Sequence, residues 1–129
     1  MHRAELLEEI AGRYGVAAEY PWRRYPQYAV FRHAGNRKWF AVLMNPPGRK
    51  LGLATEEEVA ILNVKIRAGE NSLLRGMDGV LPAYHMNKEH WVSLRLDMLP
   101  DATLLDLLAD SYGLTRAKMR HKLPSSDLL

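Results

Sequence analysis

The chain has 129 residues, of which 47% are hydrophobic and 26% charged, with a formal net charge of +3 and no cysteine. These values exclude a disulfide framework, a thiolate zinc site and a cysteine nucleophile, and they are typical of a globular protein rather than a disordered one. We therefore expect one domain over residues 1–129.

The N-terminal segment argues against export. Arg3, Glu5, Glu8 and Glu9 occupy the positions where a signal peptide needs an apolar run. No apolar stretch approaches the ~20 residues that cross a bilayer. Together with the absence of cysteine, this favours a cytoplasmic protein that does not insert into membranes.

The cations are unevenly distributed along the chain. Residues 20–55 contain seven Lys or Arg and no acid, and residues 111–126 contain four and again no acid. These two segments hold eleven of the eighteen cations. If they share a face of the fold, the surface is strongly polarised.

The first half of the chain predicts a helix and then a β-hairpin. Apolar side chains recur at helical spacing over residues 2–14, and Gly15 ends that helix. Two prolines keep residues 20–27 out of a helix, so an ordered, extended connection is expected. Residues 28–33 and 38–44 are predicted strands, and the turn at 34–37 contains Gly and Asn, which tolerate positive φ.

The middle of the chain contains a predicted loop and conflicting signals for a helix and a strand. Residues 45–50 are rich in Pro and Gly and predict an exposed loop. Residues 55–58 match a helix capping box, but the strict alternation over residues 62–67 favours a strand instead. A short helix is predicted over residues 69–77, with Leu73, Leu74 and Met77 on its buried side.

The last part predicts a hairpin over residues 84–97 and a long helix. After the polar tip, Val92, Leu94 and Leu96 are expected on the core face, and Trp91, Ser93 and Arg95 on the other. The helix begins near Asp101, and Gly113 either ends or bends it. The whole order predicts a two-layer α+β fold, in which helices cover one face of an antiparallel sheet and the other face is at least partly open.

Four ordered motifs identify a family resemblance. They are Tyr25–His33 (YPQYAVFRH), Arg37–Ala41 (RKWFA), Leu62–Lys65 (LNVK) and Tyr84–Val92 (YHMNKEHWV). Over most of its length the chain resembles the MmcQ/YjbR family of small bacterial proteins.

The resemblance implies the fold of the secretion chaperones, helix-β3-helix-β2-helix with a five-stranded antiparallel sheet, which agrees with the pattern above. It also implies DNA binding by a double wing, and it supplies no catalytic residues. The chain departs from the family at the loop over residues 45–50 and at a basic C-terminal extension, about residues 115–129.

Catalytic and metal chemistry find little support in the residues. His85 and His90 lie five residues apart across a turn, which is not a recognised ligand spacing. His33 with Ser93 or Asp97 lacks a nucleophile elbow or a phosphate-binding loop. We therefore predict no enzymatic activity, no cofactor and no metal.

The hairpin tips favour binding of DNA or another polyanion, with phosphates contacted by cations and bases by aromatic side chains. The candidate residues are Arg32, Asn36, Arg37, Lys38, Lys65, Asn87, Lys88, His90 and Trp91. Two alternatives remain open. Trp39 and Trp91 could simply brace the sheet, or the sheet face could capture a protein segment, as chaperones of this fold do.

Overall fold

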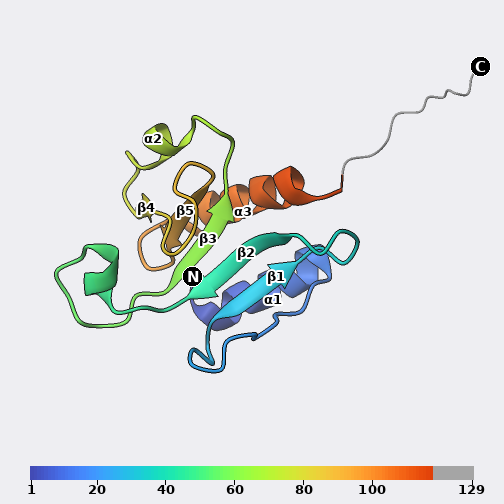
Figure 1. Cartoon of the computed structure of the whole chain (residues 1–129), viewed down its shortest axis with the longest axis horizontal. Coiled ribbons are helices and arrows are strands. Elements are labelled where there is room, and N and C mark those ends of the chain that lie inside the picture. Colours follow the sequence, from blue (N-terminus) through green and yellow to red (C-terminus); the bar gives the residue numbers. More distant parts are fainter. Residues whose placement is uncertain (118–129) are drawn as a thin grey trace, which may run out of the picture.

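The computed structural model describes residues 1–117, so most of the extension predicted at 115–129 lies outside the described residues. Its elements are α1 (Arg3–Tyr14), β1 (Ala29–Arg32), β2 (Trp39–Met44), the 3-10 helix η1 (Gly48–Leu51), β3 (Ile61–Lys65), α2 (Asn71–Leu74), β4 (Val80–Pro82), β5 (Trp91–Arg95) and α3 (Asp101–Thr115). The predicted order, helix-β3-helix-β2-helix, is confirmed (Figure 1).

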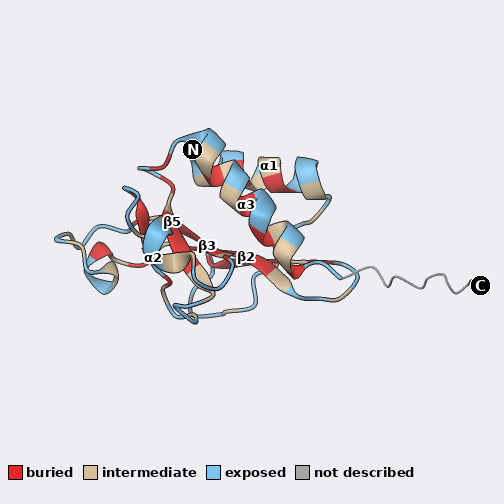
Figure 2. Cartoon of the chain, turned by 90° about the horizontal axis from the view of Figure 1, so that it is seen from above, coloured by how far each residue is buried: buried red, intermediate tan, exposed pale blue. Residues whose placement is uncertain are grey.

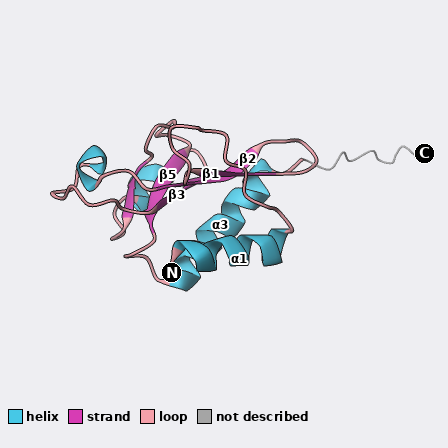
Figure 3. Cartoon of the chain, turned by 90° about the horizontal axis from the view of Figure 1, so that it is seen from below, coloured by secondary structure: helices cyan, strands magenta, loops and turns pink. Residues whose placement is uncertain are grey.

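The five strands form one antiparallel sheet in the order β1-β2-β3-β5-β4. Helices α1 and α3 lie side by side on one face, and loops run over the other (Figures 2 and 3). The main core lies under the helices, where apolar side chains alternate inward from each strand. Its largest fully buried side chains include Leu6, Ile10, Phe31, Phe40, Leu62, Leu94, Leu104 and Leu108.

A β-bulge interrupts the alternation in β2. Phe31 pairs with Ala41 whereas Arg32 pairs with Trp39, so Phe40 is an extra residue in β2. As a result Phe40 and Ala41 both join the core under the helices, and Trp39 packs on the opposite side of the sheet. The strand predicted over residues 38–44 carries no sequence sign of this bulge.

The first helix ends as predicted, but the first hairpin turn differs from the expectation. Gly15 closes α1 with a φ of 64°. In the turn after β1, the positive φ falls on Arg37, at 63°, and not on Gly35 or Asn36. The cause is local, because the Asn36 side chain accepts a hydrogen bond from the Lys38 amide and closes the turn around Arg37.

The loop after β2 is more ordered than expected. Pro46 and Gly48 are buried, and Pro47 forms an isolated bridge with Glu58. A side chain at Gly48 would collide with Thr55, so the close approach of the two segments requires glycine. No helix follows at the capping-box motif, as predicted.

The helix predicted over residues 69–77 does not bury the side chains that were expected to be buried. Helix α2 is a single turn, and Leu73 is 78% exposed and Met77 39% exposed. Leu74 alone of the three packs against the core, because one turn at the sheet edge presents only one side chain inward.

The last helix passes through Gly113 and ends at Thr115, so Gly113 does not end it. Among residues 1–117, none of the helices has both the length and the apolar character needed to cross a bilayer.

Candidate functional site

The sheet face opposite α1 and α3 is called the aromatic face. Its middle is covered, because the segment 20–27 and the loop 83–90 pack onto it. The buried members of this second cluster are Tyr28, Val30, Val42, Met44, Val59 and Ile61, and Trp22, Trp39, Leu51, Leu53, Tyr84 and Met86 pack partly buried around them. The expectation of a partly open face therefore applies to its end and not to its middle.

One end of the aromatic face carries a row in which cations and aromatic rings alternate across four neighbouring strands. Arg32 on β1 pairs with Trp39 on β2, and its guanidinium lies 5.6 Å from the Trp39 ring centroid. Lys65 on β3 pairs with Trp91 on β5. Extending the β2–β3 register by one residue brings Lys65 beside Phe40 and hence next to Trp39. We call Arg32, Trp39, Lys65 and Trp91 the cation–aromatic row.

The row remains accessible, since all four of its side chains are half-buried and α1 and α3 lie on the other side of the sheet. Because neighbouring strands lie about 4.8 Å apart, the row spans roughly 15 Å. Three of its members were predicted from the sequence, and the fold brings them together from three strands. The Trp91 side chain is half-buried, so part of its ring packs against the protein and part faces solvent. Its exposure is therefore intermediate between that of a buried brace and that of a free stacking platform.

Both hairpin loops leave the sheet at this same end, because β1, β3 and β4 all run toward it. The loops 33–38 and 83–90 therefore carry the remaining predicted residues to the two sides of the row. The second hairpin differs from the prediction, because its strands are β4 and β5 and residues 83–90 form the loop between them. Several of the predicted side chains in the two loops bond within the protein.

In the first loop, two of the three predicted residues have internal partners. Asn36 donates from Nδ2 to the Thr115 carbonyl, at 2.9 Å, and thereby holds the loop against the end of α3. An Arg37 Nη2 atom lies 3.6 Å from a Glu19 carboxylate oxygen. Lys38 is exposed and has no ion pair among residues 1–117.

Glu19 also pairs with the row itself, because its Oε1 accepts from Arg32 Nε at 3.1 Å. Two arginines of the acid-free segment 20–55 thus form ion pairs with Glu19, which directly precedes that segment. Arg32 is held in place by this contact, and its charge is partly neutralised. Lys38 and Lys65 are then the less compensated cations at this end.

The second loop folds back onto the aromatic face and does not project as a free wing. The Asn87 side chain accepts from the amides of Glu89 and His90, which shapes the turn. The Lys88 carbonyl accepts from Asn71 and Arg75, which ties the tip to the α2 region. The charged end of Lys88 stays exposed.

The base of this loop is fixed by a buried polar network. Asn63 donates to the Tyr84 carbonyl at 2.8 Å, and the Ser93 hydroxyl bonds to Asn63 and accepts from the Tyr84 amide. Asn63 and Ser93 are fully buried. Ser93 therefore supports the structure of the loop. His33, which was considered with Ser93 as a catalytic pair, follows β1, and its ring packs against Tyr112 of α3.

Ser111 positions the row from the helix side. Its hydroxyl accepts from the Lys65 amide at 2.8 Å and donates to the Phe40 carbonyl at 2.6 Å. The helix thus inserts a hydroxyl between β2 and β3 beyond their last paired residues. This contact fixes the backbone of Lys65 beside that of Phe40, the chain neighbour of Trp39, and no sequence pattern indicated it.

His33 and Thr115 anchor the end of α3 beside the first loop. His33 Nε2 lies 2.8 Å from the Thr115 hydroxyl, and both residues are buried. Burial lowers the pKa of His33 below its ordinary value, and the charge of Arg116 lowers it further, against the opposing effect of a Tyr112 backbone hydrogen bond.

A hollow of about 290 Å³ adjoins the row on the aromatic face. Its lining residues are Trp22, Tyr25, Tyr28, Trp39, Met44 and His85. Trp39 belongs to both the hollow and the row. Burial, together with neighbouring Tyr84, Tyr25 and Glu58, raises the pKa of Tyr28 to about 12, so its phenol is protonated at neutral pH. This hollow was not predicted, and the aromatic residues of segment 20–28 were only a partial sequence signal for it.

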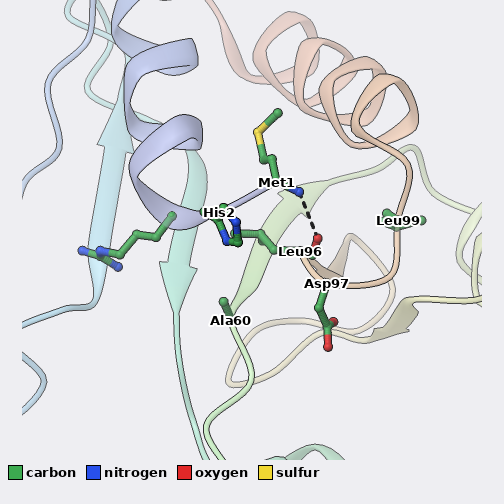
Figure 4. A pocket seen from close by; sticks show the side chains of 7 residues that line it. Met1, His2, Ala60, Leu96, Asp97 and Leu99 are labelled. Carbon is green, nitrogen blue, oxygen red and sulfur yellow. Dashed lines mark hydrogen bonds between the residues drawn. The ribbon is translucent and has the colours of Figure 1, made fainter.

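Another hollow, of about 450 Å³, lies beside the N-terminus (Figure 4). There the Met1 ammonium donates to the Leu96 carbonyl and pairs with Asp101 at 3.0 Å. Its lining combines cations with Asp97, so it lacks the single sign of charge that an anion site needs. Among residues 1–117, no three His, Asp or Glu side chains gather in a way that could hold a metal ion.

Comparison with known proteins agrees with this architecture. The YjbR family model matches residues 11–114. YyaQ of Bacillus subtilis (strain 168) is 38% identical over 115 residues, which cover 88% of this chain and 98% of YyaQ. YbdF of Escherichia coli O157:H7 is 30% identical, with coverage of 85% and 84%. A crystal structure of a Pseudomonas syringae protein superimposes with a TM-score of 0.88 at 38% identity, over 90% of this chain and 100% of that one. The chain therefore belongs to the YjbR family.

Proposed function

We propose that this protein is a non-enzymatic binding module that binds DNA or a related polyanion along the cation–aromatic row. The single observation that carries the proposal is the alternation of Arg32, Trp39, Lys65 and Trp91 across four adjacent strands. Cations spaced along a groove with aromatic rings between them contact phosphates and bases respectively. Lys38 and Lys88 extend the positive charge on either side.

This proposal differs from the double-wing mode of binding that the family resemblance implies. The row on the sheet supplies the contacts, and the two loops frame it. Asn36 and Asn87 serve mainly to shape the loops, so the proposal assigns them no direct contact with nucleic acid.

Capture of a protein segment is less well supported. Extended segments usually add to an open sheet edge or lie in an apolar groove. The middle of the aromatic face is already covered by segment 20–27 and loop 83–90. A protein partner remains an outcome of the test below.

The test is a titration of labelled DNA across a salt series, comparing Lys65→Gln with Arg13→Gln. Both variants lose one positive charge, but Arg13 lies on α1, on the other side of the sheet. We expect the log-log salt slope of the parent to be about −0.7 to −0.9 per phosphate neutralised, and Lys65→Gln to reduce its magnitude by about one such unit. Arg13→Gln should leave it unchanged. Binding that does not depend on salt would exclude the polyanion and favour a protein partner.

A further inference from the structure

We infer that the aromatic hollow receives one unpaired base, so that the ligand is single-stranded nucleic acid. This inference rests on the proposed function and deepens it. It concerns the hollow lined by Trp22, Tyr25, Tyr28, Trp39, Met44 and His85, which shares only Trp39 with the row.

The hollow has the right size for one base. The hollow measures about 290 Å³, which leaves room for one planar base against the aromatic side chains that line it. A base within a duplex is paired and stacked on its neighbours, so only an unpaired or flipped-out base can enter.

The lining has the chemistry that a base recognises. Tyr25 and Tyr28 are stacked, with ring centroids 4.6 Å apart and planes inclined by 12°. On the other side, the His85 ring lies 3.9 Å from that of Tyr84. Tyr25 is 44% exposed and His85 is also exposed, so both rings have free faces toward solvent. Aromatic faces of this kind stack with any base.

His85 is held in an unusual backbone conformation, with a φ of 60°. A non-glycine residue rarely adopts this left-handed region without a local reason. Here the conformation places the exposed ring at the rim of the hollow, against Tyr84.

Charge complementarity links the hollow to the row and identifies the occupant. Trp39 is shared by both, with Arg32 over its ring. A smaller hollow beyond His85 is lined by Lys50 and Lys88. Cations therefore flank the aromatic hollow on two sides, which suits a strand whose phosphates run over them while one base turns inward.

The test compares a short oligothymidylate with an abasic single strand that has the same number of phosphates. We expect the abasic strand to bind roughly fivefold or more weakly at the same salt concentration, because it lacks the stacked base. Binding of the oligothymidylate should also quench tryptophan fluorescence, and the abasic strand should quench it less.

Two tyrosine variants test whether the base binds in the hollow. Tyr25→Ala should lower oligothymidylate affinity toward the abasic value and leave abasic binding unchanged. Tyr20→Ala is the matched control, since Tyr20 is exposed to a similar extent, 50% against 44%, and does not line the hollow. Thermal melts of both variants check that the fold is retained.

The outcomes separate the two proposals. If the parent binds both strands equally well, the base does not enter the hollow and the inference is overturned, while phosphate binding by the row stands. If Tyr25→Ala weakens both strands alike, the inference is also overturned. If neither strand binds, the inference is overturned, and the proposed function fails as well only if duplex DNA does not bind either.

Discussion

The two faces of the sheet are built in different ways. Under α1 and α3, large side chains such as Leu6, Phe40 and Leu104 are completely buried. On the aromatic face, a smaller cluster is covered by loops, and the aromatic rings around it are only half-buried. Apolar area removed from water contributes about 25 cal/mol per Å², so the helix-covered face supplies most of the stability.

The difference between the two faces indicates which side of the sheet can bind a ligand. The sheet surface under α1 and α3 is filled by fully buried side chains, whereas the aromatic face combines cations with half-buried aromatic rings. The two faces are nevertheless coupled, because Ser111 of α3 bonds between the ends of β2 and β3 to the backbone that carries Lys65. Four predictions break or sharpen this comparison.

The largest expected effect compares one aromatic residue from each face. Phe40→Ala should lower the free energy of unfolding by about 3–5 kcal/mol, because its ring is fully buried. Trp91→Ala should cost less, about 1–3 kcal/mol, because its larger ring is only half-buried. Urea unfolding of both variants measures the difference. Equal losses would contradict the division of roles between the faces.

The second prediction concerns the coupling between the faces. Ser111→Ala removes the hydroxyl that serves both the Lys65 amide and the Phe40 carbonyl. Leaving these buried groups unsatisfied should destabilise the protein by about 1–3 kcal/mol. It should also weaken polyanion binding, since the backbone of Lys65 is then no longer fixed beside that of Phe40.

The control for this coupling is Thr115→Ser, which keeps a hydroxyl near His33 and does not touch the row. It should leave binding intact. If Ser111→Ala destabilises the fold but binds DNA as the parent does, Ser111 supports the core and does not position the row.

The third prediction is a pH dependence of stability. The folded-state pKa of His33 lies below its ordinary value of 6.5, so the unfolded chain takes up a proton more readily than the folded one. Stability should therefore be complete above about pH 6.5 and fall as the pH is lowered through that value toward the folded pKa. Arg116 and Tyr112 are the titratable neighbours that face the ring.

Melting temperatures of the parent and of His33→Gln, measured between neutral and mildly acidic pH, test this effect. The variant should show a shallower decline. An unchanged slope in the variant would mean that another group causes the pH dependence.

The smallest effect is expected at exposed positions. Leu73→Ala and Lys88→Ala should each change stability by no more than about 0.5 kcal/mol, because both side chains are exposed. They should differ in binding, since Lys88 flanks the row and Leu73 belongs to α2. A melting temperature that falls markedly in Leu73→Ala would show that its side chain packs against something in solution.

Much of the fold follows from sequence patterns that have a direct physical cause. Alternation over residues 62–67 and Gly15 after an amphipathic helix correctly predicted β3 and the end of α1. The bulge at Phe40 could not be predicted in this way, because residues 39–44 are all apolar and carry no alternation to break.

The candidate site shows a similar division. Arg32, Lys65 and Trp91 were identifiable as residues at strand ends, but their gathering in one row depends on the strand order β1-β2-β3-β5-β4. The hollow is formed from three segments that are distant in sequence, and no local pattern connects Trp22 with His85. Predictions for residues 118–129 concern positions outside the described part of the chain.

The central claim is that nucleic acid binds along the cation–aromatic row. The most direct measurement is an NMR titration of isotope-labelled protein with a short single-stranded oligonucleotide. We predict that the indole signals of Trp39 and Trp91 and the amide signal of Lys65 shift together, while the amides of α1 stay unchanged. Shifts confined to α1 or to the hollow beside Met1, or no shifts at saturating DNA, would contradict the account.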